Sequence, residues 1–438
     1  MVGKEVIEVE RGVGDKSVMV AESETEDETR DWGERDKDDF PEGGRGWFVI
    51  LGTFLILFTT YGLINCFGIY QVIYEDIFPD TKPSVISLIG SLQPGIVYLF
   101  CIPVGPMMDK IGTRYTLAVG AVIMVVAYML LSICTEIWQL FLTQGILYSV
   151  GAGIVFFTAM SVPSEWFKKR RSLAFGITAC GASVGSVVWP FVLQGLVDKI
   201  GLAWANRIIG FIYIPLFAIS IWAVVPRLQR EVRTSIWPKW SVLKDWRYTL
   251  IACSFGLAMF GFFPPLFFIS TYAHRLGVGK VIADNILTIL NSCTLIGRLI
   301  PLQLADMFGR VNMLIPCMFF IGLFPLALWL PANDEKMLLA FAVLWGTASG
   351  SCTAAFPPTL GQLFGIKDNE SRLILLYFMA IPGSVAGSSI ASALIPSNSN
   401  STEGFDSLII FSGVIFFGVT AMVLFLRFSY TTKLKVFI

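Results

Sequence analysis

The chain has 438 residues, of which 55% are hydrophobic and 15% are charged, and its mean hydropathy is +0.70. Soluble domains carry about 25% charged residues, so this composition excludes a soluble protein and predicts an all-α membrane protein that crosses the bilayer many times. The net charge is zero and the basic residues form no stripe, which argues against a nucleic-acid partner; one histidine, His274, and eight dispersed cysteines predict no metal site and no cofactor.

The first segment, residues 1–46, is strongly acidic. It holds 15 Asp or Glu and 7 Lys or Arg, a net charge of −8 that the rest of the chain balances. Because it has few aromatic residues, it cannot bury enough apolar surface to offset the entropy of ordering. We expect a disordered acidic cytosolic tail, and its polar character is unlike that of a cleavable signal peptide.

Apolar runs of roughly 20 residues follow the tail, each long enough to cross about 30 Å of hydrocarbon as a helix. The longest polar connection, 227–247, separates a first bundle at 47–226 from a second at 248–427, and a short tail at 428–438 ends the chain. The runs lie near 47–70, 86–108, 116–135, 138–162, 172–196, 208–226, 248–272, 282–305, 311–331, 337–358, 373–396 and 407–426. The sequence therefore predicts twelve transmembrane helices in two six-helix bundles.

The distribution of Lys and Arg predicts the orientation of these helices. With the N-terminus in the cytosol, the inner loops and the C-terminal tail hold 18 basic residues and the outer loops hold 6. Inner loops of membrane proteins are enriched in Lys and Arg. We therefore expect both termini in the cytosol. The plasma membrane is the favoured location, with a vacuolar or other internal membrane as the alternative.

Small residues recur in corresponding helices of the two bundles. Gly181 and Gly185 in the fifth predicted helix match Gly383 and Gly387 in the eleventh. Small residues four apart let helix backbones approach closely in lipid. Their recurrence predicts two pseudo-symmetric repeats related by an axis along the membrane normal. Two Pro-Pro pairs, 264–265 in the seventh helix and 357–358 in the tenth, are candidate discontinuities at a gate.

A loop motif recurs in the same way. The loop after the second helix contains Gly105, Asp109, Gly112 and Arg114, and Asp306, Gly309 and Arg310 repeat it in part after the eighth helix. A carboxylate such as that of Asp109 at a helix C-terminus is unfavourable beside the macrodipole, so it needs compensation from Lys110, from Arg114 or from the N-terminus of a neighbouring helix. The motif resembles the signature of the major facilitator superfamily, and the resemblance implies that these residues form a conformational latch between the halves.

Two further stretches resemble motifs of the monocarboxylate transporter family within that superfamily. They are residues 41–47 at the entry to the first helix and 166–176, which carries four basic residues before the fifth helix. The eighth-helix region, from Asn291 to Asn312, is similar to the fungal branch of the family. The resemblance covers about residues 41–427 and implies the major facilitator fold.

Arg298 is the one full charge well inside a predicted span. A central arginine costs about 2.5–3.5 kcal/mol on insertion scales, so a functional reason is expected. In the family the matching arginine takes part in anion binding, which implies a role for Arg298 in binding a substrate carboxylate. The alternative is that its side chain reaches the inner interface for structural reasons. Family position also favours Asn65 and Asn291 as substrate-binding residues.

Two positions depart from the animal carriers of that family. Thr294 stands where they have an aspartate that takes part in proton coupling, and Asn65 stands where they have a lysine. A threonine cannot carry a proton at physiological pH, and an asparagine cannot fix a carboxylate by charge. Lactate–proton symport by the animal mechanism is therefore not expected. This supports a neutral or larger organic substrate.

The sequence thus predicts a transporter, which is not an enzyme. No Gly-rich loop ending in Gly-Lys-Ser or Gly-Lys-Thr is present, so ATP hydrolysis is not expected to drive it. The expected function is secondary active or facilitative transport of a small organic solute by alternating access, with a monocarboxylate or related organic anion favoured and a proton as coupling ion. The alternatives are transport of a larger metabolite, such as riboflavin or a secondary metabolite, and a non-transporting nutrient receptor. The expected functional unit is a monomer.

Overall fold

The computed structural model describes residues 43–81, 83–227, 237–365, 368–394 and 402–430. Most of the acidic tail 1–46, nine residues of the predicted linker and most of the C-terminal tail lie outside these ranges, so the predictions made for them stay predictions. Every regular element in the described chain is a helix.

The helices fall into two groups. The first comprises α2 (Arg45–Thr59), α3 (Tyr61–Ile64), α4 (Phe67–Ile77), α5 (Pro83–Ile111), α6 (Thr113–Leu131), α7 (Ile137–Leu140), the π-helical segment η1 (Phe141–Leu147), α8 (Tyr148–Ser161), α9 (Pro163–Trp166) and α10 (Arg171–Ala223). The second comprises α11 (Trp246–Leu276), α12 (Lys280–Phe308), α13 (Arg310–Phe324), the π-helical segment η3 (Pro325–Trp329), α14 (Glu335–Leu363), α15 (Asn369–Ala393) and α16 (Asp406–Tyr430). Short 3-10 turns, Trp240–Lys244 and Thr402–Phe405, precede α11 and α16.

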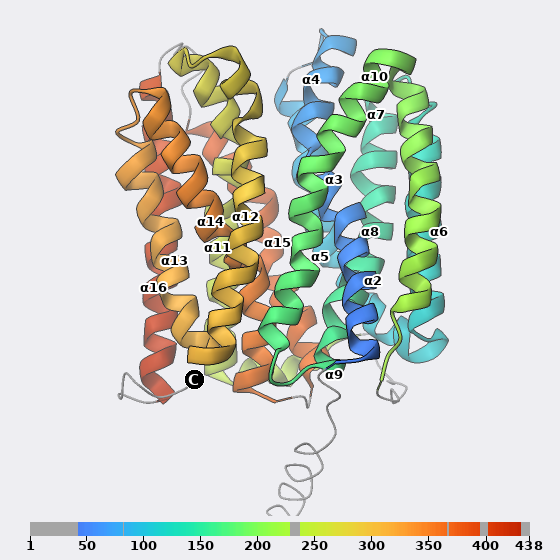
Figure 1. The fold of residues 1–438 in the computed structure, drawn as a ribbon, viewed down its shortest axis with the longest axis vertical. Helices are drawn as coiled ribbons and strands as arrows, with labels where there is room; N and C mark the ends of the chain where they lie inside the picture. Colours follow the sequence, from blue (N-terminus) through green and yellow to red (C-terminus); the bar gives the residue numbers. More distant parts are fainter. Residues whose placement is uncertain (1–42, 82, 228–236, 366–367, 395–401, 431–438) are drawn as a thin grey trace, which may run out of the picture. The chain divides into compact units, whose positions relative to one another are not determined.

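The element α10 contains two membrane crossings. Its 53 residues would extend about 80 Å at 1.5 Å per residue, far more than one bilayer needs. Gly201 interrupts it with φ 78° and ψ 165°, a conformation that glycine adopts without a steric penalty. Figure 1 shows α10 turning back there at the top of the view. Eleven helices of the described chain are long and apolar enough to cross a membrane, and the division of α10 confirms the predicted twelve.

The glycine repeat produces the same packing in both groups. A Cβ atom on Gly181 or Gly185 would collide with the carbonyl oxygens of Phe54 or Phe58 on α2. One on Gly383 or Gly387 would likewise collide with carbonyl oxygens of α11. Gly112 (φ 85°, ψ 157°) and Gly309 (φ 99°, ψ 137°) also share one backbone conformation at the starts of α6 and α13. These equivalences confirm the pseudo-symmetric repeat.

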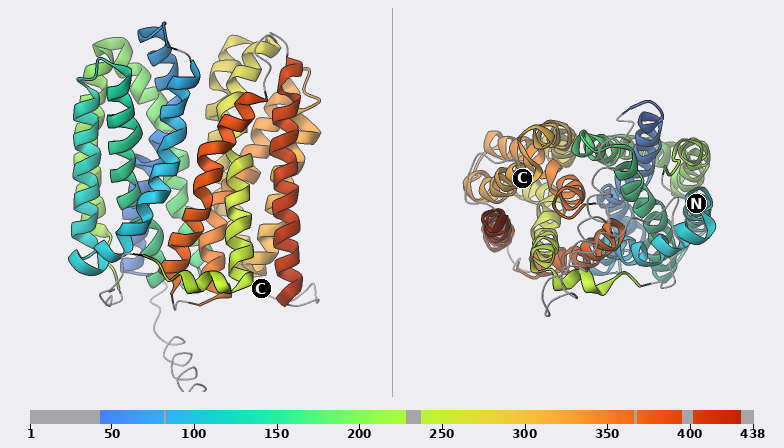
Figure 2. Two further views of the ribbon diagram at one scale, coloured as in Figure 1. Left: turned by 180° about the vertical axis from the view of Figure 1, so that it is seen from behind. Right: turned by 90° about the horizontal axis from the view of Figure 1, so that it is seen from below.

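The two groups face each other along two helix pairs. Seen from below, α10 lies beside α12 and α15 lies beside α5, and these pairs carry the main contacts between the groups (Figure 2). We refer to residues 43–223 as the first half and residues 246–430 as the second half. The groups α2–α10 and α11–α16 separate along this line in Figure 1.

The first predicted crossing is present but interrupted, and the prediction of discontinuities at the Pro-Pro pairs is wrong. The first predicted span, 47–70, is divided into α2, α3 and α4, with interruptions at Thr60 and at residues 65–66. The Pro-Pro pairs instead lie inside the continuous helices α11 and α14. In α11, Pro265 cannot donate to the carbonyl of Gly261, but the Ser412 hydroxyl of α16 donates to it at 2.7 Å. A neighbouring helix thereby satisfies the freed carbonyl, which explains why the helix is not broken.

Candidate functional site

The interrupted first crossing is fixed by donors from other helices. At the break, the Trp189 indole donates to the Phe58 carbonyl at 2.8 Å and the Tyr213 hydroxyl donates to the Thr59 carbonyl at 2.6 Å. The Tyr148 hydroxyl lies 3.0 Å from the carbonyls of both Thr59 and Thr60. Backbone groups inside a membrane must find partners within the protein. These side chains of α8 and α10 therefore hold α2 and α3 in a set position.

We call these hydrogen bonds from Tyr148, Trp189 and Tyr213 the clamp. Loss of either tyrosine hydroxyl is predicted to lower the stability of the protein. Tyr148→Phe and Tyr213→Phe each remove a buried donor and are expected to lower the free energy of unfolding by about 1–2 kcal/mol. Because both hydroxyls donate to the Thr59 carbonyl, each partly compensates for loss of the other, and the double variant should cost more than the sum of the two. Thermal unfolding in detergent measures this, with the exposed Tyr115→Phe as the control. Two additive, negligible effects would contradict the clamp.

Arg298 crosses from the second half to the first. It lies on α12 with 7% of its surface exposed, and its Nη1 donates to the Ala179 carbonyl on α10. Its Nε is buried and has no hydrogen-bond partner within the described ranges. The backbones also approach closely here, since a Cβ on Gly176 would collide with the Arg298 carbonyl. The guanidinium is therefore held between the halves and does not point into lipid.

The other two predicted binding residues occupy different places. Asn291 is 5% exposed and lies two turns before Arg298 on α12. Asn65 is partly buried at the end of α3, where the first crossing is interrupted. Between Asn291 and Arg298, the Thr294 hydroxyl lies 2.5 Å from the Ser183 hydroxyl of α10. The structure thus places Asn291, Thr294 and Arg298 on α12, with Thr294 and Arg298 contacting α10, and places Asn65 at the interruption after α3.

The second copy of the loop motif joins the halves at the predicted cytosolic end, where α10 begins and α12 ends. The Asp306 carboxylate accepts hydrogen bonds from the backbone N–H groups of Ser172 at 3.1 Å and Leu173 at 2.9 Å. These are first-turn donors of α10, which has no side-chain cap of its own. A carboxylate is favourable at a helix N-terminus. Asp306 of the second half therefore caps a helix of the first.

Arg310 completes this connection. Its side chain is 9% exposed and pairs with Asp306 at 3.0 Å. It also donates to the Ser172 hydroxyl at 2.8 Å and to the Lys168 carbonyl at 3.1 Å, both in the first half, and to the Pro358 carbonyl at 3.2 Å in its own half. One ion pair thus makes hydrogen bonds to three segments, and several of these bonds cross between the halves.

The first copy of the motif lies between α5 and α6, within the first half. Gly105 is buried in α5, Asp109 is partly buried near the end of α5, Gly112 begins α6 and Arg114 is exposed. Among the basic residues before the fifth crossing, Arg171 is 3% exposed and donates to the carbonyls of Phe167 and Ser164. It therefore packs inside the protein.

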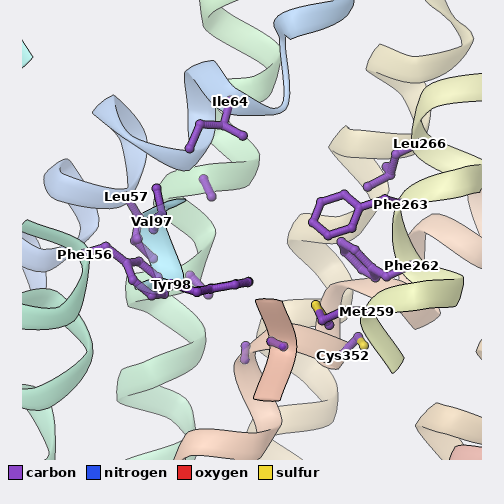
Figure 3. Close-up of a cluster of buried hydrophobic side chains, with 14 of the residues drawn as sticks. Leu57, Ile64, Val97, Tyr98, Phe156, Met259, Phe262, Phe263, Leu266 and Cys352 are labelled. Atoms are coloured by element: carbon purple, nitrogen blue, oxygen red, sulfur yellow. The ribbon is translucent and has the colours of Figure 1, made fainter. Parts of the chain in front are cut away.

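Apolar side chains of the two halves face each other in the middle of the molecule. Figure 3 shows one set from the first half and one from the second, pointing toward the space between them. The labelled side chains include no charged residue; they are Leu57, Ile64, Val97, Tyr98 and Phe156 from the first half and Met259, Phe262, Phe263, Leu266 and Cys352 from the second. Apolar and aromatic side chains therefore dominate this part of the interface between the halves.

Five rings connect these two sets, and we call them the aromatic junction: Tyr61, Tyr98, Phe156, Phe255 and Tyr377. Tyr98 of α5 stacks on Tyr377 of α15, with ring centroids 5.4 Å apart and planes 11° apart. Phe156 meets the Tyr377 ring at 5.2 Å and Phe255 meets it at 6.1 Å. Tyr61 packs on Phe156 at 5.0 Å. The junction therefore joins α3, α5 and α8 of the first half to α11 and α15 of the second.

Several of these residues had no signal in the sequence. Tyr98 lies in an apolar run that resembles any lipid-facing segment, and Ala179 contributes only a backbone carbonyl. Ser183 falls between Gly181 and Gly185, and this small-residue stretch of α10 was the one available indication of close helix contact.

Comparison with known proteins gives a consistent result. The sequence matches the Major Facilitator Superfamily profile over residues 46–302. It is 31% identical to the MFS transporter asaE of Aspergillus flavus over 408 residues, 92% of this chain and 91% of that protein. It is 31% identical to the Agnestins efflux protein AgnL12 of Paecilomyces divaricatus (90% and 89% covered) and 30% identical to the Aspyridones efflux protein apdF of Emericella nidulans (88% and 79% covered).

Among solved structures, the human organic anion transporter MFSD10 (TETRAN) is similar in fold. The TM-score is 0.69, and the match covers 88% of this chain and all of that one. The sequence identity is 14%. At this identity the likeness concerns the arrangement of the helices.

Proposed function

Because the chain belongs to the major facilitator superfamily, we propose that it is a secondary transporter that moves an organic solute between its two halves by alternating access. The observation that carries this proposal is that the two halves meet through two kinds of contact, one polar and one apolar. Asp306, Arg310 and Arg298 join the halves along α10 and α12, while the apolar sets of Figure 3 face each other farther in. Transporters of this architecture bind solutes near the bilayer midplane, at the interface of their repeats.

We propose a lipophilic metabolite, exported from the cell, as the solute, ahead of a small monocarboxylate. The facing side chains are apolar or aromatic, and such a surface offers little compensation for the desolvation of a small anion. The names of two relatives, which describe efflux of agnestins and of aspyridones, support export as the direction of transport. The resemblance of the sequence to the monocarboxylate transporter family then does not set the substrate.

An organic anion is the second candidate, because Arg298 keeps a buried Nε without a partner in the described chain. A carboxylate could accept from this nitrogen, with Asn65 and Asn291 as further polar groups along the solute's path. The likeness to an organic anion transporter concerns the fold. Proton coupling remains part of the proposal, with no proton carrier assigned.

Flux through the purified protein in proteoliposomes tests the proposal. A panel should contain a dihydroxyanthraquinone, a neutral polyketide, riboflavin, lactate and benzoate, each with and without a proton gradient. We expect saturable flux of at least one conjugated member and little flux of lactate. A receptor on the same scaffold would bind a member of the panel without moving any, and this result would overturn the proposal.

The orientation and the membrane are proposed with the function. We propose that both termini are cytosolic, that the protein lies in the plasma membrane and that a monomer is the functional unit. Protease protection of an N-terminal tag in sealed, right-side-out vesicles tests the orientation. Cleavage of the tag from outside would overturn it.

A further inference from the structure

The aromatic junction contains a hydroxyl group that packing does not explain. Tyr377 is 2% exposed, and its hydroxyl oxygen is buried without a hydrogen-bond partner in the described residues. Burying an unpaired hydroxyl is unfavourable, and a phenylalanine would supply the same ring without this penalty. The hydroxyl therefore suits a partner that is not part of the described chain.

The ring arrangement indicates the shape of that partner. The Tyr98 and Tyr377 rings are nearly parallel, with Phe156 and Phe255 meeting the Tyr377 ring at 68° and 74°. Flat faces and ring edges of this kind recognise other π-systems through offset-stacked and edge-to-face contacts. Because Tyr98 and Tyr377 belong to different halves, a flat ligand at this point contacts both halves at once.

The side chains around the aromatic junction indicate the polarity of the partner of the Tyr377 hydroxyl. The labelled side chains of Figure 3 are apolar apart from the phenolic group of Tyr98. An ion transferred into such surroundings would lose its hydration without a compensating charge. A neutral carbonyl or phenolic oxygen requires one donor, and the Tyr377 hydroxyl is such a donor.

We propose that the aromatic junction binds a planar, conjugated organic molecule whose carbonyl or phenolic oxygen accepts a hydrogen bond from the Tyr377 hydroxyl. This inference rests on the proposed function, since it names the class of solute that the transporter carries. The ligand stacks on the rings that join the two halves, and its binding is thereby linked to the contact between α5 and α15.

Binding of a dihydroxyanthraquinone to the purified full-length protein, measured by equilibrium dialysis, tests the inference. The wild-type protein should bind this probe, and Tyr377→Phe should weaken the binding by about 5- to 10-fold, the effect of one neutral hydrogen bond. Anthracene, which has the same three fused rings and no oxygen, should bind both proteins equally. Tyr115→Phe, at a position 72% exposed, is the matched control and should change neither affinity.

Thermal unfolding of the ligand-free protein distinguishes a binding role from a structural one. Removing a hydroxyl that has a structural partner would lower the Tm, whereas removing an unpaired buried hydroxyl should leave the Tm unchanged or raise it. A lower Tm in Tyr377→Phe would overturn the inference, as would the absence of probe binding to the wild type.

The flux measurement separates this inference from the proposed function. If the wild-type protein moves a panel solute and Tyr377→Phe binds the probe with unchanged affinity, the inference is wrong and the transporter function stands. If no solute moves under any gradient, the proposed function itself is wrong.

Discussion

Asp306→Asn is expected to have one of the largest effects of any single substitution, reducing solute flux at least tenfold. The carboxylate caps α10 across the interface and pairs with Arg310, whose side chain is 9% exposed. Removing one partner of a buried ion pair costs about 3–5 kcal/mol, and the remaining hydrogen bonds of Arg310 place the expected cost at the lower end. The lost bonds join the halves in this conformation, so the balance shifts toward conformations in which α10 and α12 separate.

Labelling of Cys180 measures that shift directly. Cys180 lies on α10 facing α12, is 4% exposed and has its Sγ 3.9 Å from the Leu295 carbonyl oxygen. A thiol reagent, read by peptide mass spectrometry, should modify Cys180 faster in Asp306→Asn than in the wild type. Asp245→Asn is the matched control, because Asp245 caps its own helix α11 by accepting from Arg247 N–H. Equal labelling of Cys180 in all three proteins would contradict the role of Asp306.

Arg298→Gln is the second substitution with a large expected effect. Its Nη1 donates across the interface to the Ala179 carbonyl, and a hydrogen bond to a charged group contributes about 1.5–3 kcal/mol. We expect flux of neutral and anionic solutes to fall alike, by roughly 10- to 100-fold, because the substitution weakens a contact that every transport cycle uses. Arg207→Gln is the matched control, since Arg207 donates to Ser132 within the first half.

The comparison of solutes decides between the two roles of this arginine. A variant that loses flux of benzoate while keeping full flux of a neutral polyketide would show that Arg298 pairs with a substrate carboxylate. In that case Arg298 does not act by joining the halves, and the organic anion becomes the leading solute class.

The repeat and the twelve crossings could be predicted because local patterns determine them. Apolar runs fix the crossings by length, and Gly181 and Gly383 fix how their helices pack, since each glycine permits a backbone contact that a side chain would block. The loop motif likewise identified Asp306 and Arg310. Its partners were not predictable, because Asp306 binds backbone N–H groups of Ser172 and Leu173, which carry no sequence signal.

The break in the first crossing shows a second limit of sequence reasoning. The run around residues 55–70 is mostly apolar and contains no proline, whereas the Pro-Pro pairs suggested breaks elsewhere. Whether a helix is interrupted depends on hydrogen-bond donors that lie far away in the sequence. Tyr148, Trp189 and Tyr213 supply donors at the break in the first crossing, and Ser412 supplies one beside Pro265. Such donors are between 88 and 154 residues away in sequence. The Tyr98–Tyr377 pair is likewise visible only once the halves are placed together.

A reversible cross-link between α10 and α12 tests the central claim, that solute moves by separation of the two halves. The hydroxyls of Ser183 and Thr294 lie 2.5 Å apart across the interface, so cysteines at both positions, with Cys180 replaced by alanine, should form a disulfide on oxidation. The account predicts that oxidation reduces solute flux in proteoliposomes to background and that a reductant restores it, while each single cysteine variant is unaffected. Undiminished flux through protein in which the disulfide has formed would contradict it.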